Sequence, residues 1–148
     1  MPLVYRAETD IPAPADAVWK VLRDFDNYGE WNVFNPVASS SGEIGTRIRL
    51  TVVLRGLRVT APETVRELTA PSRLVWGFDF WVIWAERVQT LTPTPEGCHY
   101  VTEDRIGGLL SPIVGLMFGR ALQSGFEQMT ADLSQRCQER GLAFHLQR

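Results

Sequence analysis

The chain has 148 residues, of which 45% are hydrophobic and 22% charged, and its 15 Lys+Arg against 17 Asp+Glu give a formal net charge of −2. This composition is ordinary for a folded protein, and the length predicts one domain spanning residues 1–148. The mild acidity without a basic run excludes a nucleic-acid surface. No apolar stretch is long enough for stable insertion into a membrane.

The N-terminal residues and the two cysteines indicate where in the cell the protein is located. Arg6 and Glu8 interrupt the region where a signal peptide would need an unbroken apolar core, so a cytoplasmic location is expected. Cys98 and Cys137 fit a reducing environment, and a disulfide between them is not expected.

The first third of the chain predicts one strand followed by helical structure. Residues 4–11 alternate as in a strand, which Pro12 and Pro14 end because neither can donate to a ladder. An apolar stripe predicts a helix from about Asp16, and residues 24–31 predict a second short helix or turn. Residues 32–42, rich in Asn, Pro and Ser, are interpreted as a loop.

Five further strands are predicted, at residues 44–54, 58–68, 73–80, 84–92 and 98–106. Pro62 falls inside the second of these and predicts an edge position or a bulge there. The last two strands form a hairpin around the loop 93–97. Six strands, a helical insertion and a final helix indicate an α+β layout.

The final helix is predicted from Pro112 to Arg140, with Ser111 as its cap and Gly141 as its stop. A helix of this length in a short chain needs a large concave surface, which a curved antiparallel sheet provides. The first turns of this helix are apolar on all sides, as expected of a buried or partner-facing segment. Further along the helix, the apolar surface is reduced to one stripe.

Glycines inside this helix each cost about 1 kcal/mol relative to alanine. They are Gly115, Gly119 and Gly125. Such positions leave volume for a ligand or for close backbone approach, or they mark a bend or tight packing on the sheet. The sequence leaves both interpretations open.

Four local patterns occur in a fixed order along the chain. They are Ile11–Trp19 with Leu22–Phe25, Tyr28–Asn32, Pro71–Trp76 and Gly107–Pro112. In this order they resemble the START-like (SRPBCC) helix-grip superfamily, which includes polyketide cyclase/dehydrase and lipid-transport proteins. The resemblance implies six or seven antiparallel strands wrapped around a long C-terminal helix, two short helices after the first strand, and a deep, mostly apolar cavity between sheet and helix.

The last hairpin carries the polar residues of interest. If it pairs around the 93–97 loop, Arg87 falls opposite Thr102 and Asp104, and the resemblance points these residues into the cavity. A bonded Arg87–Asp104 pair would be tolerable there and would orient a carbonyl or carboxylate on an apolar ligand. A register one residue off would turn them to solvent and bring in the alternates. Those alternates are Glu86, Glu103 and Arg105.

The aromatic residues are numerous, and most are expected in the core. Trp31 and Phe34 are the exceptions, since they lie in a loop where a cavity mouth would be. The run from Trp81 to Trp84 is apolar on both faces, which suggests a strand covered on both sides or a dimer patch. The complete candidate ligand-cavity set is Trp31, Phe34, Leu50, Trp76, Phe78, Arg87, Gln89, Tyr100, Thr102, Asp104, Met117, Ala121 and Gly125.

Three functions compete. The first is binding or transport of a small hydrophobic molecule, such as a lipid, polyketide or aromatic compound. The second is an enzyme of the polyketide cyclase, aromatase or dehydratase kind, and the third is a protein-interaction module. The enzyme hypothesis gains if Asp104 or a glutamate lies in the cavity with a raised pKa.

The sequence assigns no catalytic residue. It has no Gly-x-Ser-x-Gly elbow and no glycine-rich phosphate loop. His99 and His145 lack partners at a zinc-like spacing, so neither a metal nor a cofactor is expected. A hydrophobic small molecule is the expected partner, and the sequence leaves a homodimer open.

Overall fold

The computed structural model describes residues 2–39 and 43–146. The chain is α+β. In order, its elements are β1 (Leu3–Ile11), α1 (Ala15–Arg23), the 3₁₀ helix η1 (Phe25–Glu30), β2 (Val37–Ser39), β3 (Arg47–Leu54), β4 (Leu57–Thr69), β5 (Arg73–Phe80), β6 (Ile83–Thr94), β7 (Gly97–Gly107) and α2 (Ser111–Leu146).

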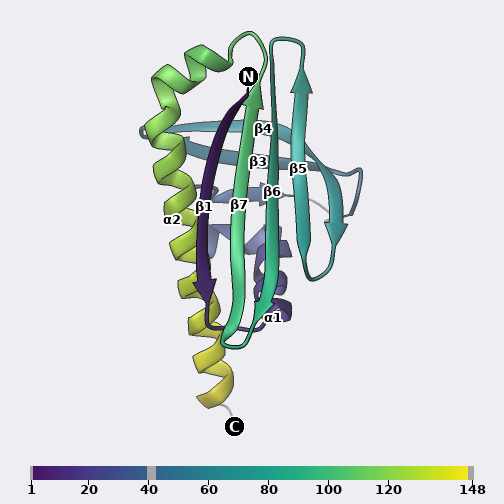
Figure 1. Cartoon of the computed structure of the whole chain (residues 1–148), viewed down its shortest axis with the longest axis vertical. Helices are drawn as coiled ribbons and strands as arrows, with labels where there is room; N and C mark the ends of the chain where they lie inside the picture. Colours follow the sequence, from purple (N-terminus) through teal and green to yellow (C-terminus); the bar gives the residue numbers. More distant parts are fainter. Residues whose placement is uncertain (1, 40–42, 147–148) are drawn as a thin grey trace.

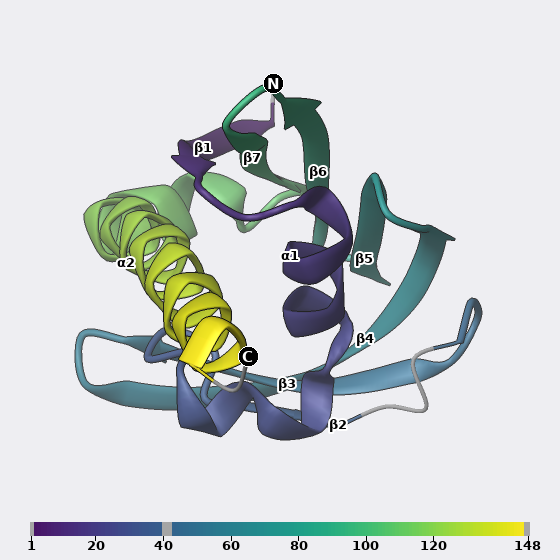
Figure 2. The same ribbon diagram turned by 90° about the horizontal axis from the view of Figure 1, so that it is seen from below.

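All strands belong to one antiparallel sheet in the order β1-β7-β6-β5-β4-β3-β2. The sheet curves around α2, which contacts β1, β7 and β3 (Figure 1). Seen end-on, α1 lies inside the curve at the end where α2 finishes (Figure 2). The helix-grip fold expected from the sequence is therefore confirmed. The end of the molecule where α2 begins is called the upper end below.

The predicted strands are confirmed with small shifts at their ends. Pro62 lies where β4 pairs with β3 alone, because β4 meets β5 only from Thr64 onward, and a bulge follows between Val65 and Glu67. On the side of β4 that later meets β5, Pro62 has no neighbouring strand. Its missing N–H therefore costs no ladder hydrogen bond on that side.

One loop prediction and one strand interpretation are wrong. The segment 32–42 contains β2, a three-residue strand paired with β3 that is too short to show alternation. Trp81 is not in a strand, since Trp81 and Val82 form the turn between β5 and β6. This two-residue turn contains none of the Gly, Pro, Asn, Asp or Ser residues that usually mark turns. The sequence pattern therefore did not reveal it.

Both predicted ends of the last helix are corrected. Helix α2 continues through Gly141, which is not among the described glycines with positive φ and so makes no left-handed stop. At the other end, the Ser111 hydroxyl donates to the carbonyl of Gly108 at 2.9 Å instead of accepting an N–H of the helix. Gly108 itself has a φ of 99° and turns the chain from β7 into α2.

The core occupies the lower half of the curve. The buried stripe of α2 repeats at helical spacing and packs with α1, η1 and the sheet. It consists of Leu122, Phe126, Met129, Leu133 and Cys137. Cys98 and Cys137 are both buried free thiols, as expected.

Three glycines of α2 face other parts of the protein. A Cβ on Gly125 would lie 2.1 Å from the Phe34 ring, and a Cβ on Gly115 would lie 2.9 Å from Leu3. A Cβ on Gly119 would lie 3.1 Å from the Tyr5 hydroxyl. Of the two interpretations open from the sequence, the structure therefore favours tight packing.

Changing Gly125 to alanine should lower the free energy of unfolding by about 1–2 kcal/mol, because overpacking against the buried Phe34 ring outweighs the gain in helix propensity. The matched control is Gly141→Ala, where nothing lies within 4 Å of the new Cβ and a gain of up to about 1 kcal/mol is expected. Urea denaturation measures both changes. Equal effects at the two positions would show that Phe34 does not lie over Gly125 in solution.

Candidate ligand-binding site

The register of the last hairpin turns the predicted polar residues inward. Arg87 pairs with Asp104 and Gln89 with Thr102, and all four are buried. The alternate residues lie on the outer face, where they form ion pairs. Glu86 is 2.9 Å from Arg66, and Glu103 is 2.9 Å from Arg105.

Neutral groups satisfy the guanidinium of Arg87. Its Nε donates to Thr102 Oγ1 at 2.9 Å, Nη1 to Asn35 Oδ1 at 3.0 Å and Nη2 to Met129 Sδ at 2.8 Å. The rings of Trp76 and Phe126 lie 5.4 and 4.8 Å from its central carbon. The expected bonded Arg87–Asp104 pair is therefore wrong. The two residues are cross-strand neighbours, but no ion pair joins them in the described part of the chain.

Most of the predicted cavity residues meet in this lower half and cover one another. The Tyr100 hydroxyl donates to Gln89 Oε1, and Phe34 packs edge-on against Phe126 at 5.0 Å. Trp31 is half-buried and packs edge-on against Tyr28 at 5.1 Å. Leu50, Trp76 and Thr102 are also fully buried. The prediction that these residues lie close together is therefore correct. Their contact with a ligand stays a prediction.

The upper half of the concave face is apolar and only partly covered. On the β3–β4 hairpin, Val52 pairs with Val59 and Leu54 with Leu57, on the same face as buried Leu50. Coverage decreases toward the tip of the β3–β4 hairpin and toward the upper ends of β5, β6 and α2. Val52, Leu54, Phe78, Ile83, Val114, Phe118 and Ala121 are half-buried, whereas Leu57, Val59, Phe80 and Met117 are exposed.

Met117, a predicted cavity residue, is half exposed at the edge of this region, and its contact with a ligand stays a prediction. The hairpin lies next to it, because Arg55 Nη1 donates to the Met117 carbonyl at 3.4 Å. Helix periodicity alone could not tell the covered side of this helix from the uncovered one, because its first turns are apolar all round.

Two acidic side chains lie between the packed lower half and the uncovered upper half. Glu63 on β4 is 8% exposed and Asp104 on β7 is 9% exposed. Burial raises the pKa of Glu63 to about 8, with a further contribution from Asp104. Burial likewise raises the pKa of Asp104 to about 7, and the nearby charge of Arg87 opposes both shifts.

Neither carboxyl group makes a hydrogen bond or ion pair within residues 2–39 and 43–146. The completely covered polar side-chain atoms without a partner in that part of the chain are Asn32 Nδ2, Gln89 Nε2 and Arg136 Nε. The carboxyl oxygens of Glu63 and Asp104 are absent from this group, so they keep some accessible surface. Tyr5 on β1 pairs with Asp104, which together with burial raises the pKa of the Tyr5 hydroxyl.

The sequence analysis missed Glu63, although a signal was present. Residues 57, 59, 61, 63 and 65 read Leu, Val, Ala, Glu and Val, so Glu63 interrupts an otherwise apolar face. A carboxylate on such a face indicates either a paired charge or a functional group.

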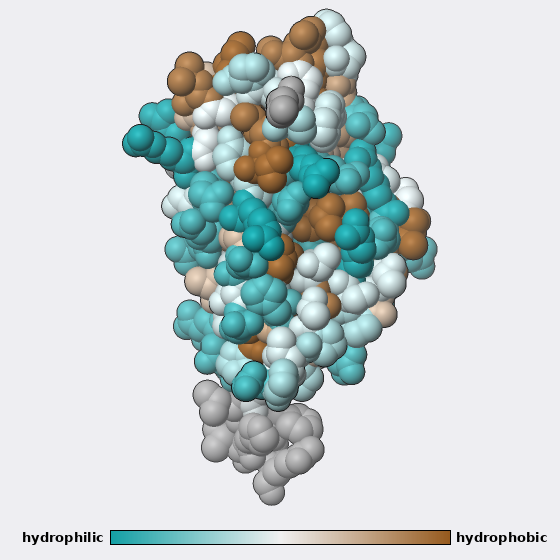
Figure 3. Space-filling model, viewed as in Figure 1, coloured by the Kyte–Doolittle hydropathy of each residue, from teal (hydrophilic) through white to brown (hydrophobic). Residues whose placement is uncertain are grey.

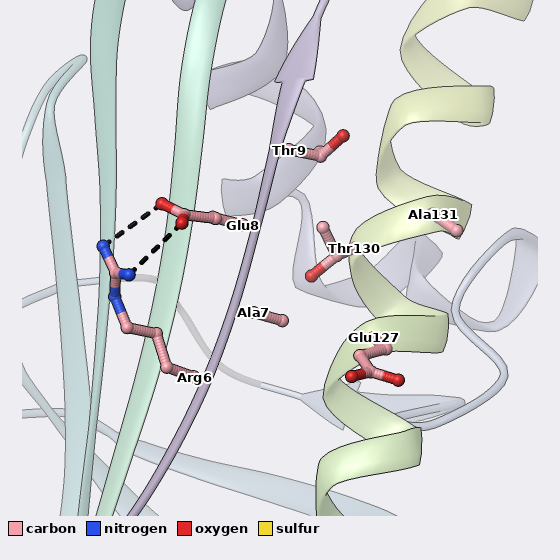
Figure 4. Close-up of a pocket in the computed structure, with 7 residues that line it drawn as sticks. All are labelled: Arg6, Ala7, Glu8, Thr9, Glu127, Thr130 and Ala131. Carbon is pink, nitrogen blue, oxygen red and sulfur yellow. Dashed lines mark hydrogen bonds and ion pairs between the residues drawn. The ribbon is translucent and has the colours of Figure 1, made fainter.

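Three surface pockets lie outside this region. One of about 410 Å³ separates β1 from α2, where Ala7 and Thr130 line it and the Arg6–Glu8 ion pair points away from the helix (Figure 4). Another, of about 800 Å³, lies between residues 12–21 and 137–141. Trp31 borders a third pocket, of about 150 Å³, beside Arg136. None of these three includes Glu63 or Asp104.

No helix in the described ranges is long and apolar enough to cross a bilayer. Within the same ranges, no three His, Cys, Asp or Glu residues gather closely enough to hold a metal ion.

The fold and the polar groups inside it define a helix-grip protein with an apolar interior. Residues 3–138 match the family described as "Polyketide cyclase / dehydrase and lipid transport", and the chain belongs to this family. A curated relative is "Oxopyrrolidines biosynthesis cluster protein O" of Penicillium oxalicum, which is 29% identical. That match covers 67% of this chain and 66% of the relative, so the chain spans just under two thirds of its length.

Solved structures share the fold at low sequence identity. TTHA0849 from Thermus thermophilus has a TM-score of 0.77 and 19% identity, covering 93% of this chain and 98% of the other. SA2116 from Staphylococcus aureus, a protein of unknown function, has a TM-score of 0.74 and 11% identity, covering 96% and 97%. The di-domain ARO/CYC StfQ from the steffimycin biosynthetic pathway has a TM-score of 0.74 and 13% identity, covering 95% of this chain and 52% of that one.

Proposed function

We propose that the protein binds a small, mainly apolar molecule between the upper half of the concave face and the first turns of α2. The observation that carries this proposal is the meeting of a partly covered apolar surface with two largely buried carboxyl groups, Glu63 and Asp104. Their oxygens keep some accessible surface and make no hydrogen bond to the described residues, so a ligand can complete their hydrogen bonds.

The chemistry of the two acids narrows the ligand class. Because their pKa values are raised to about 8 and about 7, both carboxyl groups hold protons over part of the neutral range and can donate hydrogen bonds. A carbonyl or hydroxyl group on a lipid, polyketide or aromatic compound would accept them. Three hydrogen bonds hold the Arg87 guanidinium in place. Its positive charge therefore stays close to the polar group of the bound ligand.

A second candidate function is acid–base catalysis on the same molecule. Two carboxyl groups that titrate near neutral pH can take up and return protons during an enolisation or dehydration. The enzyme hypothesis requires an acid in the cavity with a raised pKa, and the raised pKa values of Glu63 and Asp104 support the second part of this condition. The family description and the ARO/CYC neighbours add support for polyketide-like substrates, and the curated relative belongs to an oxopyrrolidines biosynthesis cluster. A pure interaction module is less well supported, because the upper half of the concave face is only partly covered.

Filling the uncovered region should abolish ligand uptake. Val52→Trp places an indole on the concave face of β3, and binding of a fluorescent apolar dye should fall at least about tenfold. Val53→Trp is the matched control, because neighbouring strand residues point to opposite faces and this side chain lies on the outside. Equal dye binding by the two variants would refute the proposed location.

Native mass spectrometry of the protein purified from its own host would identify the ligand class. Incubating the recovered compound with wild-type, Glu63→Gln and Asp104→Asn proteins then separates the two functions. Binding alone leaves the compound unchanged in all three samples. Catalysis converts it in the wild type and slows when either acid is replaced.

A further inference from the structure

A group of large apolar side chains lies exposed at the upper end of the molecule. Trp81 is 83% exposed at the β5–β6 turn, Leu109 is 78% exposed in the loop before α2, and Leu116 is 89% exposed on the helix. Phe80, Leu110, Ile113 and Met117 complete the group, which is called the apolar end. Figure 3 shows hydrophobic surface gathered over the corresponding end of the molecule.

The two segments that form the apolar end are held together. The Leu110 N–H donates to the Val82 carbonyl at 3.0 Å, so the β5–β6 turn lies against the start of α2. Gly108 makes this approach possible, because a Cβ there would lie 2.7 Å from the Val82 carbonyl oxygen. An apolar surface of this kind on a protein without a basic or acidic excess marks an interaction site.

The charges next to the apolar end are positive. Arg55 reaches the Met117 carbonyl, and Arg120 follows Leu116 by one helical turn. Neither arginine makes an ion pair within the described residues. Asp79, the acid next to Phe80 in the chain, is already bonded to Arg66 at 2.8 Å. Uncompensated positive charge therefore borders the apolar end, although the whole chain carries −2.

This combination fits one occupant better than the others. In a two-fold dimer through the apolar end, the same patch meets itself, which would bring Arg55 and Arg120 toward their own copies at a repulsive cost. A lipid surface offers apolar chains for Trp81, Leu109 and Leu116 and anionic headgroups for the arginines. Tryptophan is also favoured at the membrane–water boundary.

We propose that the apolar end docks on the surface of a bilayer that contains anionic lipid, without crossing it. The uncovered upper half of the concave face adjoins this end. A bound apolar molecule could therefore pass between bilayer and protein with little exposure to water.

The test is cosedimentation of the full chain with vesicles of phosphatidylcholine alone and with vesicles in which about a third of the lipid is phosphatidylserine. The wild type should bind the anionic vesicles, and the variant W81S/L109S/L116S should bind them at least about tenfold more weakly. The variant R55Q/R120Q should lose the preference for anionic vesicles, and added salt should weaken wild-type binding. Val33→Ser, at a side chain 64% exposed but outside the apolar end, is the control and should bind as the wild type does.

Two results would overturn the proposal. One is wild-type binding that is absent, or unchanged in W81S/L109S/L116S while circular dichroism shows the same fold. The other is a dimer, seen by analytical ultracentrifugation, that this triple variant dissolves while vesicles capture neither protein. The vesicles carry no ligand, and none of the substituted residues lies beside Glu63 or Asp104. A negative result with vesicles would therefore refute membrane docking without refuting ligand binding, which the dye experiment tests separately.

Discussion

Replacing Arg87 with alanine should lower the free energy of unfolding by about 4 kcal/mol. The change removes three buried hydrogen bonds, leaves Asn35 Oδ1 without its donor and opens a void between Trp76 and Phe126. Urea denaturation followed by tryptophan fluorescence measures the loss. Because Arg87 is 3% exposed, water cannot replace the lost partners in the folded state.

Two further variants test the cause of this loss. Arg87→Lys keeps the charge, but an ammonium group cannot reproduce the planar fork that reaches three partners, so it should recover only a small part of the stability. Arg49→Ala, at an exposed position on β3, should change stability by less than about 0.5 kcal/mol. If Arg87→Ala were as stable as Arg49→Ala, the buried guanidinium network would not exist in solution.

The protein should be less stable at pH 9 than at pH 5. Glu63 and Asp104 have raised pKa values in the folded state, so the folded protein holds their protons at pH values where the unfolded chain has released them. Stability therefore falls as the pH rises from about 4, where the unfolded acids ionise, to about 8, where the folded ones do. Thermal or urea denaturation across this range measures the decline.

Glu63→Gln and Asp104→Asn identify the groups responsible. Each amide stays neutral, so at pH 9 each variant should be more stable than the wild type by about 2 kcal/mol or more, while the difference shrinks toward pH 5. The comparison is needed because His99, which bonds Asp10 and Glu8 on the surface, also has a raised pKa and shifts stability in the same direction. A wild-type decline that persists unchanged in both variants would assign it to His99 instead.

Local sequence patterns were sufficient for most of the fold. Alternation predicted the strands, and the predicted hairpin brought Arg87 close to Asp104, although the observed turn is shorter than the predicted 93–97 loop, with Thr94 already paired with Gly97. The patterns failed where structure depends on partners distant in sequence. β2 exists only because β3 lies beside it, and α2 passes through Gly141 because nothing there requires the chain to turn.

The polar site was predicted in part, for the same reason. Strand period alone indicates which side chains share a face, so Asp104 and Arg87 were found. Besides Thr102, the partners of the guanidinium are Asn35, from the loop after η1, and Met129, from the buried stripe of α2. Only the folded chain brings these together, and periodicity therefore suggested a direct bond to Asp104 that is not made.

The strand order has a consequence for how the chain is made. β1 lies at one edge of the sheet and pairs only with β7, so residues 3–11 must await residues 98–106. While the ribosome synthesises everything between, this first strand has no ladder to join, and its Leu3, Tyr5 and Ile11 side chains have no core to enter. The other strand pairs are neighbours along the chain, so they can form their hydrogen bonds as soon as both strands have left the ribosome. Closure of the grip is thus a late event in biosynthesis, and a nascent chain stalled before β7 would expose an unpaired strand to its neighbours.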